Sequence, residues 1–162
     1  AVMPYVWKSN VTLRDLAQMT GHSTSKILAS NGLMDISELR PGNRINLPCY
    51  EGKYLLGPDD TLEWLASAFS YPNIAELAKF NGFTDPLALR GRVDIKLPGW
   101  YFFYARAGDS LAETDKMFDL PPGCSRTVGR AAHPSPGKPF PLETIAVPST
   151  EFAKAYITDS LG

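Results

Sequence analysis

The chain has 162 residues, of which 44% are hydrophobic and 20% are charged, as is typical of a folded protein with one core or several small ones. Its formal net charge of -1 gives no electrostatic footprint for nucleic acid, and no apolar run reaches the ~20 residues needed for membrane insertion. The 14 prolines and 13 glycines predict frequent turns and therefore short helices and strands.

The N-terminus and the two cysteines each fit two interpretations. Residues 1–5 lack the basic start and apolar core of a signal peptide, so either a signal was removed before Ala1 or only an initiator Met was removed. Cys49 and Cys124 match no zinc-binding spacing, and two cysteines are too few for a disulfide framework. One Cys49–Cys124 bridge and two separate thiols both fit the sequence.

The first predicted elements are two strands that enclose two helices. Residues 5–7 are aromatic or β-branched and predict the opening strand. Thr12 is the predicted N-cap of a helix whose apolar face carries Leu13, Leu16 and Ala17. A second helix is expected to stop at Asn31-Gly32, because glycine readily takes the left-handed conformation that ends helices. Residues 44–48 predict a closing strand that ends at its final proline.

The same order recurs in the middle of the chain. Residues 54–56 predict a strand, and Thr61 is the predicted N-cap of the next helix. The apolar face of that helix has the spacing i, i+3, i+4, i+7 and consists of Leu62, Leu65, Ala66 and Phe69. A second helix, capped by Asn73, is expected to run to the Asn81-Gly82 stop. Residues 93–98 predict the closing strand, again ended by proline.

A third stretch keeps the two ends of this pattern. Residues 102–105 and 144–148 predict its opening and closing strands, and Ser110 followed by Glu113 predicts a capping box at the start of a helix. After the closing strand, Ser149 is a predicted N-cap for a terminal helix that would dock on the preceding strands and helices or lead to a partner. The apolar positions of that helix are Phe152, Ala155 and Tyr156.

The middle of the third stretch departs from the pattern. Its helix carries Thr114 and Asp115 where the earlier helices are apolar, so it should pack less well or pack against another part of the chain. Residues 120–124 are rigid, with two adjacent prolines and no Asn-Gly stop. The second helix of this stretch is therefore expected to be shortened or absent.

Two landmarks indicate that the three stretches are copies of one unit. A Thr-Leu pair at position 12 recurs at 61 and, as Ser-Leu, at 110, a step of 49 residues each time. The closing runs end at prolines 48, 98 and 148, a step of 50 residues. The sequence thus predicts an α+β protein with units over 1–49, 50–99 and 100–148 and a tail over 149–162. Because the linkers, Cys49–Gly52 and Gly99-Trp100, are short, the units should pack as one compact block.

These residues resemble the LysM (lysin motif) module. Its pattern is an aromatic opening strand, Gly-Asp-Thr-Leu, an Asn near the end of the second helix and a closing Ile-x-Ile-Pro. The second copy matches best, through Tyr54, Asp60-Thr61-Leu62, Leu65-Ala66, Asn81, Leu89-Arg90-Gly91 and Ile95-Lys96-Leu97-Pro98. The third copy is degenerate and keeps only residues 108–111 and 145–148. The resemblance implies three tandem βααβ modules, each with both helices on one side of a two-stranded antiparallel sheet.

The family resemblance also implies a ligand, a glycan that contains N-acetylglucosamine, such as peptidoglycan or chitin. In the family, the groove lies between the loop after the first strand and the loop after the second helix, where backbone groups bind the N-acetyl group. Carried over by residue, the groove consists of Asn10, Val11, Thr12, Leu33 and Met34 in the first copy and Pro58, Asp59, Asp60, Thr61, Gly82, Phe83, Thr84, Asp85 and Pro86 in the second. In the third copy only Gly108, Asp109 and Ser110 carry over, with Pro134-Ser135-Pro136 as the candidate for the opposite wall.

The favoured function is non-catalytic glycan binding at the cell wall, outside the cell or in the periplasm. His22 and His133 have no partners for a catalytic triad or a metal site, so we expect no enzyme activity, metal or cofactor. The alternative is a structural adaptor in a phage tail, baseplate or related contractile assembly that binds protein instead of glycan, with the virion tail as its location. The first loops favour this alternative, because Asp59 replaces the family's glycine and the first copy lacks its Gly-Asp pair.

Several side chains have a structural and a functional interpretation. Trp7 and Trp64 fit either core packing or a platform for a sugar ring, and core packing is favoured for Trp7. Asp60 and Asp109 fit either a helix N-terminus, the favoured role, or a sugar contact. Phe83 fits the floor of a groove and a plug in the core equally well.

Overall fold

A computed structural model of the chain describes residues 1–33, 42–85, 94–105, 108–129 and 143–157. The described residues form an α+β fold, as predicted, in which β1 and β2 make one sheet and β3, β4, β6 and β5, in that order, make another. The strands are β1 (Val2–Val6), β2 (Arg44–Pro48), β3 (Tyr50–Leu55), β4 (Asp94–Tyr104), β5 (Arg126–Thr127) and β6 (Thr144–Pro148). The helices are α1 (Leu13–Thr20), α2 (Thr24–Ser30), α3 (Leu62–Ala68), α4 (Ile74–Phe80), α5 (Leu111–Met117) and α6 (Thr150–Phe152), continued by a π-helical turn (Ala153–Ile157).

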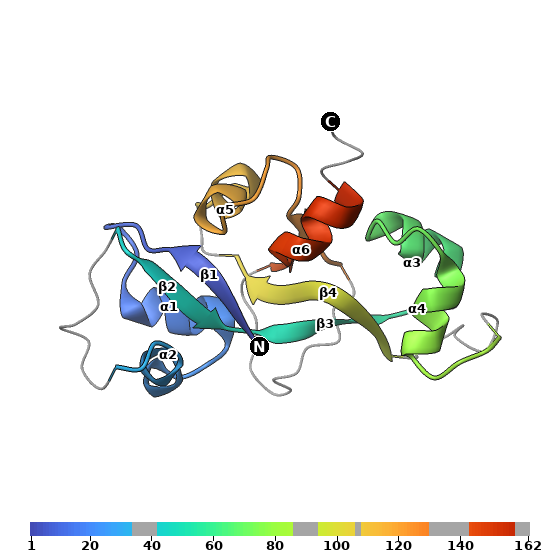
Figure 1. Ribbon diagram of the computed structural model, residues 1–162, viewed down its shortest axis with the longest axis horizontal. Coiled ribbons are helices and arrows are strands. Elements are labelled where there is room, and N and C mark those ends of the chain that lie inside the picture. The colour runs from blue at the N-terminus through green and yellow to red at the C-terminus, as the bar shows by residue number, and fades with distance from the viewer. Residues whose placement is uncertain (34–41, 86–93, 106–107, 130–142, 158–162) are drawn as a thin grey trace.

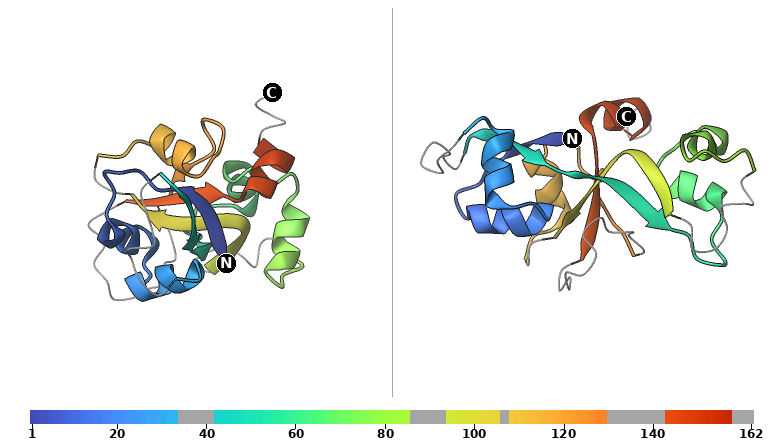
Figure 2. Two further views of the ribbon diagram at one scale, coloured as in Figure 1. Left: turned by 60° about the vertical axis from the view of Figure 1, so that its left-hand side comes forward. Right: turned by 90° about the horizontal axis from the view of Figure 1, so that it is seen from below.

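The helices lie at the two ends and on top of the central strands. Figures 1 and 2 show α1 and α2 at one end of the long axis, α3 and α4 at the other, and α5 and α6 between them. Within the described ranges, each helix is too short or too polar to cross a membrane.

The first segment (residues 1–49) has the order strand, helix, helix, strand. β1 and β2 pair antiparallel, with Tyr5 opposite Ile45. The Thr12 hydroxyl caps α1 by accepting from the Asp15 N–H at 3.0 Å, and the Asp15 carboxylate accepts from the Thr12 N–H at 2.9 Å. This reciprocal pair is a capping box, so the predicted N-cap is confirmed.

The second segment (residues 50–99) has the same order, and its predicted caps are confirmed. Thr61 caps α3 by accepting from the Trp64 N–H at 3.1 Å, and Asn73 caps α4 by accepting from the Ala75 N–H at 2.7 Å. β3 pairs antiparallel with β4, mainly with its first half. In the third segment (residues 100–148), Ser110 caps α5, and the part that the structure describes shows no second helix before β6.

An asparagine ties the second helix to the closing strand in the first two segments. The Asn31 amide donates to the carbonyls of Ile27 (2.8 Å) and Asn46 (2.9 Å), and its Oδ1 accepts from the Asn46 N–H (2.7 Å). Asn81, 50 residues later, makes the same three bonds with Leu77 and Lys96, at 2.8, 3.2 and 2.6 Å. Each side chain thus replaces a neighbouring strand at one position of the sheet edge.

Left-handed residues end the first helix of all three segments at equivalent positions. Gly21, Ser70 and Asp119, each 49 residues from the next, have φ of 72°, 60° and 58°. After Ser70 and Asp119 the chain makes the paired hydrogen bonds of a Schellman motif, with Tyr71 N–H to the Ala66 carbonyl as one of them. Non-glycine residues rarely take positive φ, so this shared geometry reflects a common turn.

The strand predicted to end at Pro98 continues, which corrects the expectation of a Gly99-Trp100 linker. β4 is one 11-residue strand that pairs with β3 on both sides of a bulge, while its second half also pairs with β6 on the other edge. The register with β3 jumps from Leu97 to Tyr101, so a bulge accommodates the proline that lacks an N–H. The second and third segments therefore share one strand and one sheet.

The carbonyls of the bulge find partners outside the sheet. The Tyr71 hydroxyl donates to the Pro98 carbonyl at 2.6 Å, and the Ser149 N–H donates to the Gly99 carbonyl at 2.7 Å. Ser149 also caps the terminal helix by accepting from the Phe152 N–H at 3.1 Å, which confirms its predicted cap. The terminal helix docks on the protein rather than leading away, since the Phe152 ring meets Trp100 edge-on at 5.5 Å.

The first segment packs against the third. Tyr5 in β1 donates to the Met117 sulfur at 3.1 Å and meets the Phe118 ring edge-on at 5.2 Å. Arg44 in β2 forms an ion pair with Asp119, just after α5. Trp7 is buried, as favoured from the sequence.

The polar face of α5 is also buried. The Asp115 carboxylate accepts from the N–H groups of Gly123 (3.0 Å) and Ser125 (2.8 Å), and the Thr114 hydroxyl donates to the Ser110 carbonyl (3.1 Å). Asp115 therefore holds the proline-containing stretch that replaces a second helix. This explains why the helix does not need the apolar residues of α1 and α3.

The two cysteines are separate buried thiols, so of the two interpretations the structure has the unbridged one. Burial raises the pKa of Cys49 to about 12. Burial and the Asp115 carboxylate also raise the pKa of Cys124.

Candidate functional site

The first predicted loop of the first segment is a closed turn between β1 and α1. The Val11 N–H donates to the Lys8 carbonyl at 3.1 Å, and the Trp7 indole N–H donates to the Val11 carbonyl at 2.6 Å. Asn10 and Thr12 are exposed, but the Val11 side chain is 2% exposed and belongs to the core. The prediction that Val11 lines a groove is therefore wrong for its side chain.

The second predicted loop of this segment follows α2. Gly32 has φ of 68°, and the Leu33 N–H donates to the Leu28 carbonyl at 3.0 Å, which completes a Schellman motif. Leu33 is half-buried, and Met34 lies outside the described residues. Next to the first loop, the Trp7 N–H donates to the Asn43 carbonyl, and next to the second loop, the Asn31 amide donates to the Asn46 carbonyl. Both loops therefore adjoin the same β1–β2 ladder.

The first predicted loop of the second segment is the equivalent turn. The Asp60 N–H donates to the Gly57 carbonyl at 3.1 Å, and the Asp60 carboxylate accepts from the Gly57 N–H at 2.8 Å. Asp60 therefore closes its own turn, while Thr61 caps the helix. Pro58 and Asp59 are exposed at the tip of the turn.

The second predicted loop of this segment follows α4. Gly82 has φ of 76°, and the Phe83 N–H donates to the Ala78 carbonyl at 3.0 Å. The Phe83 ring is half-buried and packs against the core, while Thr84 and Asp85 are exposed. Pro86 lies outside the described residues.

Trp64 stands beside the first of these loops, in the first turn of α3. It is 46% exposed, and its ring centroid lies 5.7 Å from that of the buried Tyr54. An indole exposed to this extent offers apolar surface to which a sugar ring can bind.

In the third segment, only one of the two loop positions is described. Gly108 is exposed with φ of 89°, Asp109 is half-buried and Ser110 caps α5. Residues 134–136, the expected opposite wall, lie outside the described residues, as does His133.

His22 lies at the turn between α1 and α2. Its ring stacks on Tyr50 at 4.1 Å, and its Nε2 is buried without a hydrogen-bond partner. Burial, with a smaller contribution from Lys26, lowers the pKa of His22. Within the described ranges, no three His, Cys, Asp or Glu side chains gather where they could hold a metal ion.

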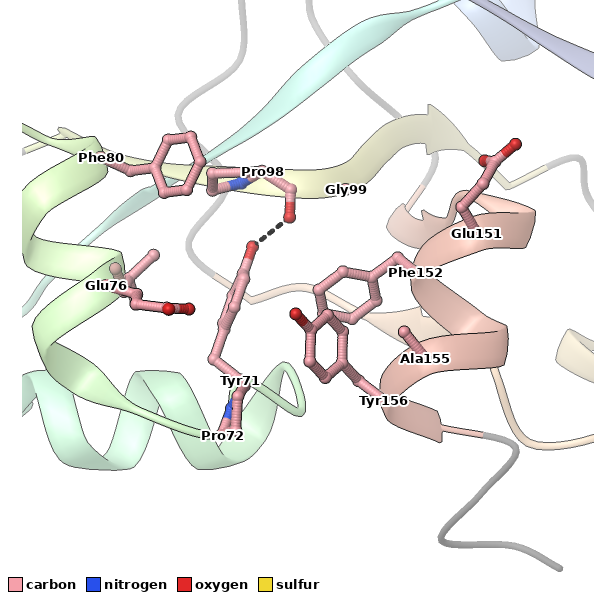
Figure 3. A pocket seen from close by; sticks show the side chains of 11 residues that line it. Tyr71, Pro72, Glu76, Phe80, Pro98, Gly99, Glu151, Phe152, Ala155 and Tyr156 are labelled. Atoms are coloured by element: carbon pink, nitrogen blue, oxygen red, sulfur yellow. Dashed lines mark hydrogen bonds between the residues drawn. The ribbon is translucent and has the colours of Figure 1, made fainter.

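A pocket that the sequence did not predict lies between α4, the β4 bulge and the terminal helix (Figure 3). It has a volume of about 360 Å³ and shares no residue with the predicted loops. Its lining comprises Tyr71, Pro72, Glu76, Leu77, Phe80, Pro98, Gly99, Glu151, Phe152, Ala155 and Tyr156. The sequence signal would have been the pair Glu76 and Phe80, one turn apart on the exposed side of α4.

Comparison with known proteins finds a matching family and similar solved structures. Residues 8–48 match the LysM domain family. The crystal structure of the Bacillus cereus spore cortex-lytic enzyme SleL is similar at 22% identity with a TM-score of 0.31, over 60% of this chain. The match spans 23% of the SleL chain, so this protein covers less than a quarter of that enzyme's length. No curated protein matches the chain.

Proposed function

We propose that this protein binds a glycan containing N-acetylglucosamine, of the peptidoglycan or chitin type, without altering it chemically. The observation that carries the proposal is the match of residues 8–48 to LysM, a family of modules that bind such glycans. The two loops expected to form its groove adjoin the same two-stranded ladder in the first segment. LysM domains occur in extracellular and cell-wall-associated proteins, and we propose that location here.

We further propose that residues 50–99 and 100–148 are diverged copies of the same module. The repeated geometry supports this, since Asn81 reproduces the three bonds of Asn31 and the turn at 57–60 reproduces the turn at 8–11. The second copy would supply a second groove. The third copy, which contains α5 and β6, would give structural support to the other two. Two grooves on one rigid body would add avidity on a polymer, because each small site binds weakly alone.

In the proposed grooves, exposed backbone and loop side chains meet the sugar. Asn10 and Leu33 would border the first groove, and Asp59 and Thr84 the second, since each is exposed or half-buried beside its loop. Trp64 would offer its exposed indole surface next to the second groove.

The alternative proposal is a structural adaptor in a phage tail or contractile assembly. One observation favours it: the first loops use their own polar groups internally. The Asp15 carboxylate accepts a hydrogen bond from the Thr12 N–H, and the Asp60 carboxylate accepts one from the Gly57 N–H. Fewer backbone groups then remain for an N-acetyl group than in a loop built on glycine.

Retention on insoluble chitin and on purified peptidoglycan tests the two proposals. Glycan binding predicts that at least one polymer retains the protein and that soluble N-acetylglucosamine oligomers release it. If neither polymer retains the folded protein, the glycan proposal is wrong. Tail or baseplate genes beside this gene would then support the adaptor.

Paired variants locate the groove. Arginine at two loop positions that border the proposed groove should block it, as in Asn10→Arg with the half-buried Leu33→Arg for the first copy and Asp59→Arg with Thr84→Arg for the second. Ser25→Arg with Ser67→Arg changes the charge by two at exposed helical positions outside the loops, as the first pair does, and is its matched control. Ser25→Arg with Glu113→Arg changes the charge by three, as the second pair does, and is the control for the second copy. Loss of retention in the controls as well would show that binding is only electrostatic.

A further inference from the structure

The pocket beside the terminal helix has aromatic walls. Tyr71, Phe80, Phe152 and Tyr156 line it, and two of these rings are unusually open, Phe80 at 67% and Tyr156 at 40% exposure. Figure 3 shows Tyr71 in the middle, with Phe80 on one side and Phe152 and Tyr156 on the other. Solvent-exposed aromatic rings that gather at one hollow mark a binding site more often than scattered ones do.

Hydrogen bonds and ring contacts hold three of these four rings, Tyr71, Phe152 and Tyr156, in place. The Tyr71 hydroxyl is fixed by its bond to the Pro98 carbonyl, and the Tyr71 ring meets Phe152 edge-on at 5.2 Å. The Phe152 ring in turn lies 4.8 Å from Tyr156. The pocket is therefore formed before any ligand enters, which lowers the entropy cost of binding.

The charge of the pocket is negative. Its charged lining residues among those described are Glu76 and Glu151, while Lys79 lines an adjoining hollow on the other side of Glu76 and Phe80. In Figure 3 the Glu76 side chain extends from α4 toward Tyr71, while Glu151 lies at the outer edge. Glu51 adds to this potential, because it contributes with burial to raising the pKa of both Tyr71 and Tyr101.

We propose that this pocket binds an alkylammonium group. The negative faces of the aromatic rings attract a cation, the apolar walls cover its alkyl carbons, and the Glu76 carboxylate supplies the counter-charge. An anionic ligand would be repelled by both glutamates. A purely apolar ligand would cover the Glu76 carboxylate without giving it a partner, which costs free energy.

Binding is tested by NMR titration of the full chain with choline and with 3,3-dimethylbutanol, its neutral analogue of the same shape. Choline should shift the ring signals of Tyr71, Phe80 and Tyr156 and bind roughly tenfold more tightly than the neutral alcohol. Equal affinity for both would overturn the proposal, as would the absence of binding by any cation tested.

The bound alkylammonium group could belong to a lysine side chain or to a quaternary ammonium compound. Titration with a second ligand, Nα-acetyl-lysine methylamide, distinguishes them, because it presents the primary ammonium of a lysine in a peptide. Stronger binding of this compound supports recognition of a lysine side chain on a protein partner. Stronger binding of choline supports recognition of a quaternary ammonium.

Matched variants assign the binding to the pocket. Glu76→Gln keeps the shape of the side chain and should weaken choline binding roughly three- to tenfold, and Phe80→Ala should weaken it by a similar factor. Glu63→Gln and Leu111→Ala change an exposed acid on α3 and an exposed apolar side chain on α5, both outside the pocket, and should have no effect. If the α4 variants bind as the parent does, the proposal fails. Retention on chitin or peptidoglycan should not change in Glu76→Gln, so the outcome is independent of the glycan proposal.

Discussion

The Asn31 and Asn81 side chains close the exposed edge of a strand. An amide carries both a donor and an acceptor on one planar group, so it reproduces the hydrogen bonding of a peptide unit. Each asparagine bonds to both backbone groups of one strand residue and to the last turn of its own helix. The helix end and the sheet edge are thereby fixed together, and the edge is less available for pairing with another chain.

Replacing this amide should therefore destabilise the fold. Asn81→Ala removes all three bonds and should lower the free energy of unfolding by about 1–2 kcal/mol, since the site is partly solvated. Asn81→Asp keeps the acceptor and loses the donor, so its loss should be smaller unless repulsion between the carboxylate and the two carbonyls dominates. Urea denaturation measures both, with the exposed Gln18→Ala as control. An unchanged midpoint for Asn81→Ala would contradict the role.

The Cys49 thiol gives a pH dependence at the alkaline end. Burial raises its pKa from 9.0 to about 12, so the unfolded chain loses this proton at a lower pH than the folded chain. The free energy of unfolding should then fall as the pH rises above 9.0, with a slope of up to about 1.4 kcal/mol per pH unit from this group. Cys49→Ala should make the decline shallower when urea denaturation is repeated across this range. An equally steep decline in the variant would assign the effect to other groups.

For single residues, the sequence predicts the features that depend on near neighbours in the chain. The caps Thr12, Thr61, Asn73, Ser110 and Ser149 are all confirmed, because a cap depends on its neighbours three residues away. Asn31 and Asn81 were predicted as helix stops, but their strand partners lie 15 residues further along the chain. That pairing depends on tertiary packing, which local patterns do not reveal.

Among the elements, β4 departs most from expectation. Proline followed by glycine normally interrupts a strand, and the sequence therefore predicted a break there. The strand survives because a bulge moves Pro98 and Gly99 out of the ladder, and because Tyr71 and Ser149 satisfy their carbonyls. Both partners come from elsewhere in the chain, so the spacing of residues around Pro98 could not predict them.

Gly99 is the most constrained residue of this strand. Its φ is 89°, and a Cβ added there would lie 2.5 Å from the Phe152 ring. Gly99→Ala should lower the free energy of unfolding by about 2–4 kcal/mol, from backbone strain together with displacement of the terminal helix. Thermal unfolding measures the loss. Gly129→Ala, where an added Cβ meets nothing within 4 Å, is the control and should be close to neutral.

For the whole molecule, contacts between distant segments make the chain one body. The first sheet touches α5 through the Tyr5–Met117 bond and the Arg44–Asp119 ion pair. The terminal helix covers Trp100 at the centre of the second sheet. No segment therefore buries its apolar surface alone.

This arrangement predicts a single cooperative transition. The change in tryptophan fluorescence on unfolding should include the exposure of the buried Trp7, next to the first sheet, and Trp100, on the shared strand. Its urea transition should coincide with that of far-ultraviolet circular dichroism, as for one folding unit. A first transition that involves Trp7 alone, isolated with a Trp64→Phe, Trp100→Phe double variant, would show that the first segment unfolds independently.

Part of the candidate site could be predicted from the sequence, and part depends on the packing of distant segments. The loop positions followed from a repeated pattern, and the structure places them beside β1–β2 and β3–β4, although Val11 turns into the core. The pocket at Tyr71 combines α4, β4 and the terminal helix, which are far apart in sequence. Packing alone brings these residues together, so no spacing could have indicated them.

The shared strand also limits how such a chain changes over evolution. Many repeat proteins gain or lose whole units, because each unit brings its own complete set of strands and helices. Here β4 belongs to the second and third segments at once, so deleting residues 105–148 would leave half of an 11-residue strand without its β6 partner. The exposed backbone would favour association of two chains edge to edge. The number of segments is therefore fixed by the fold, and variation between relatives should be confined to loops and surface side chains.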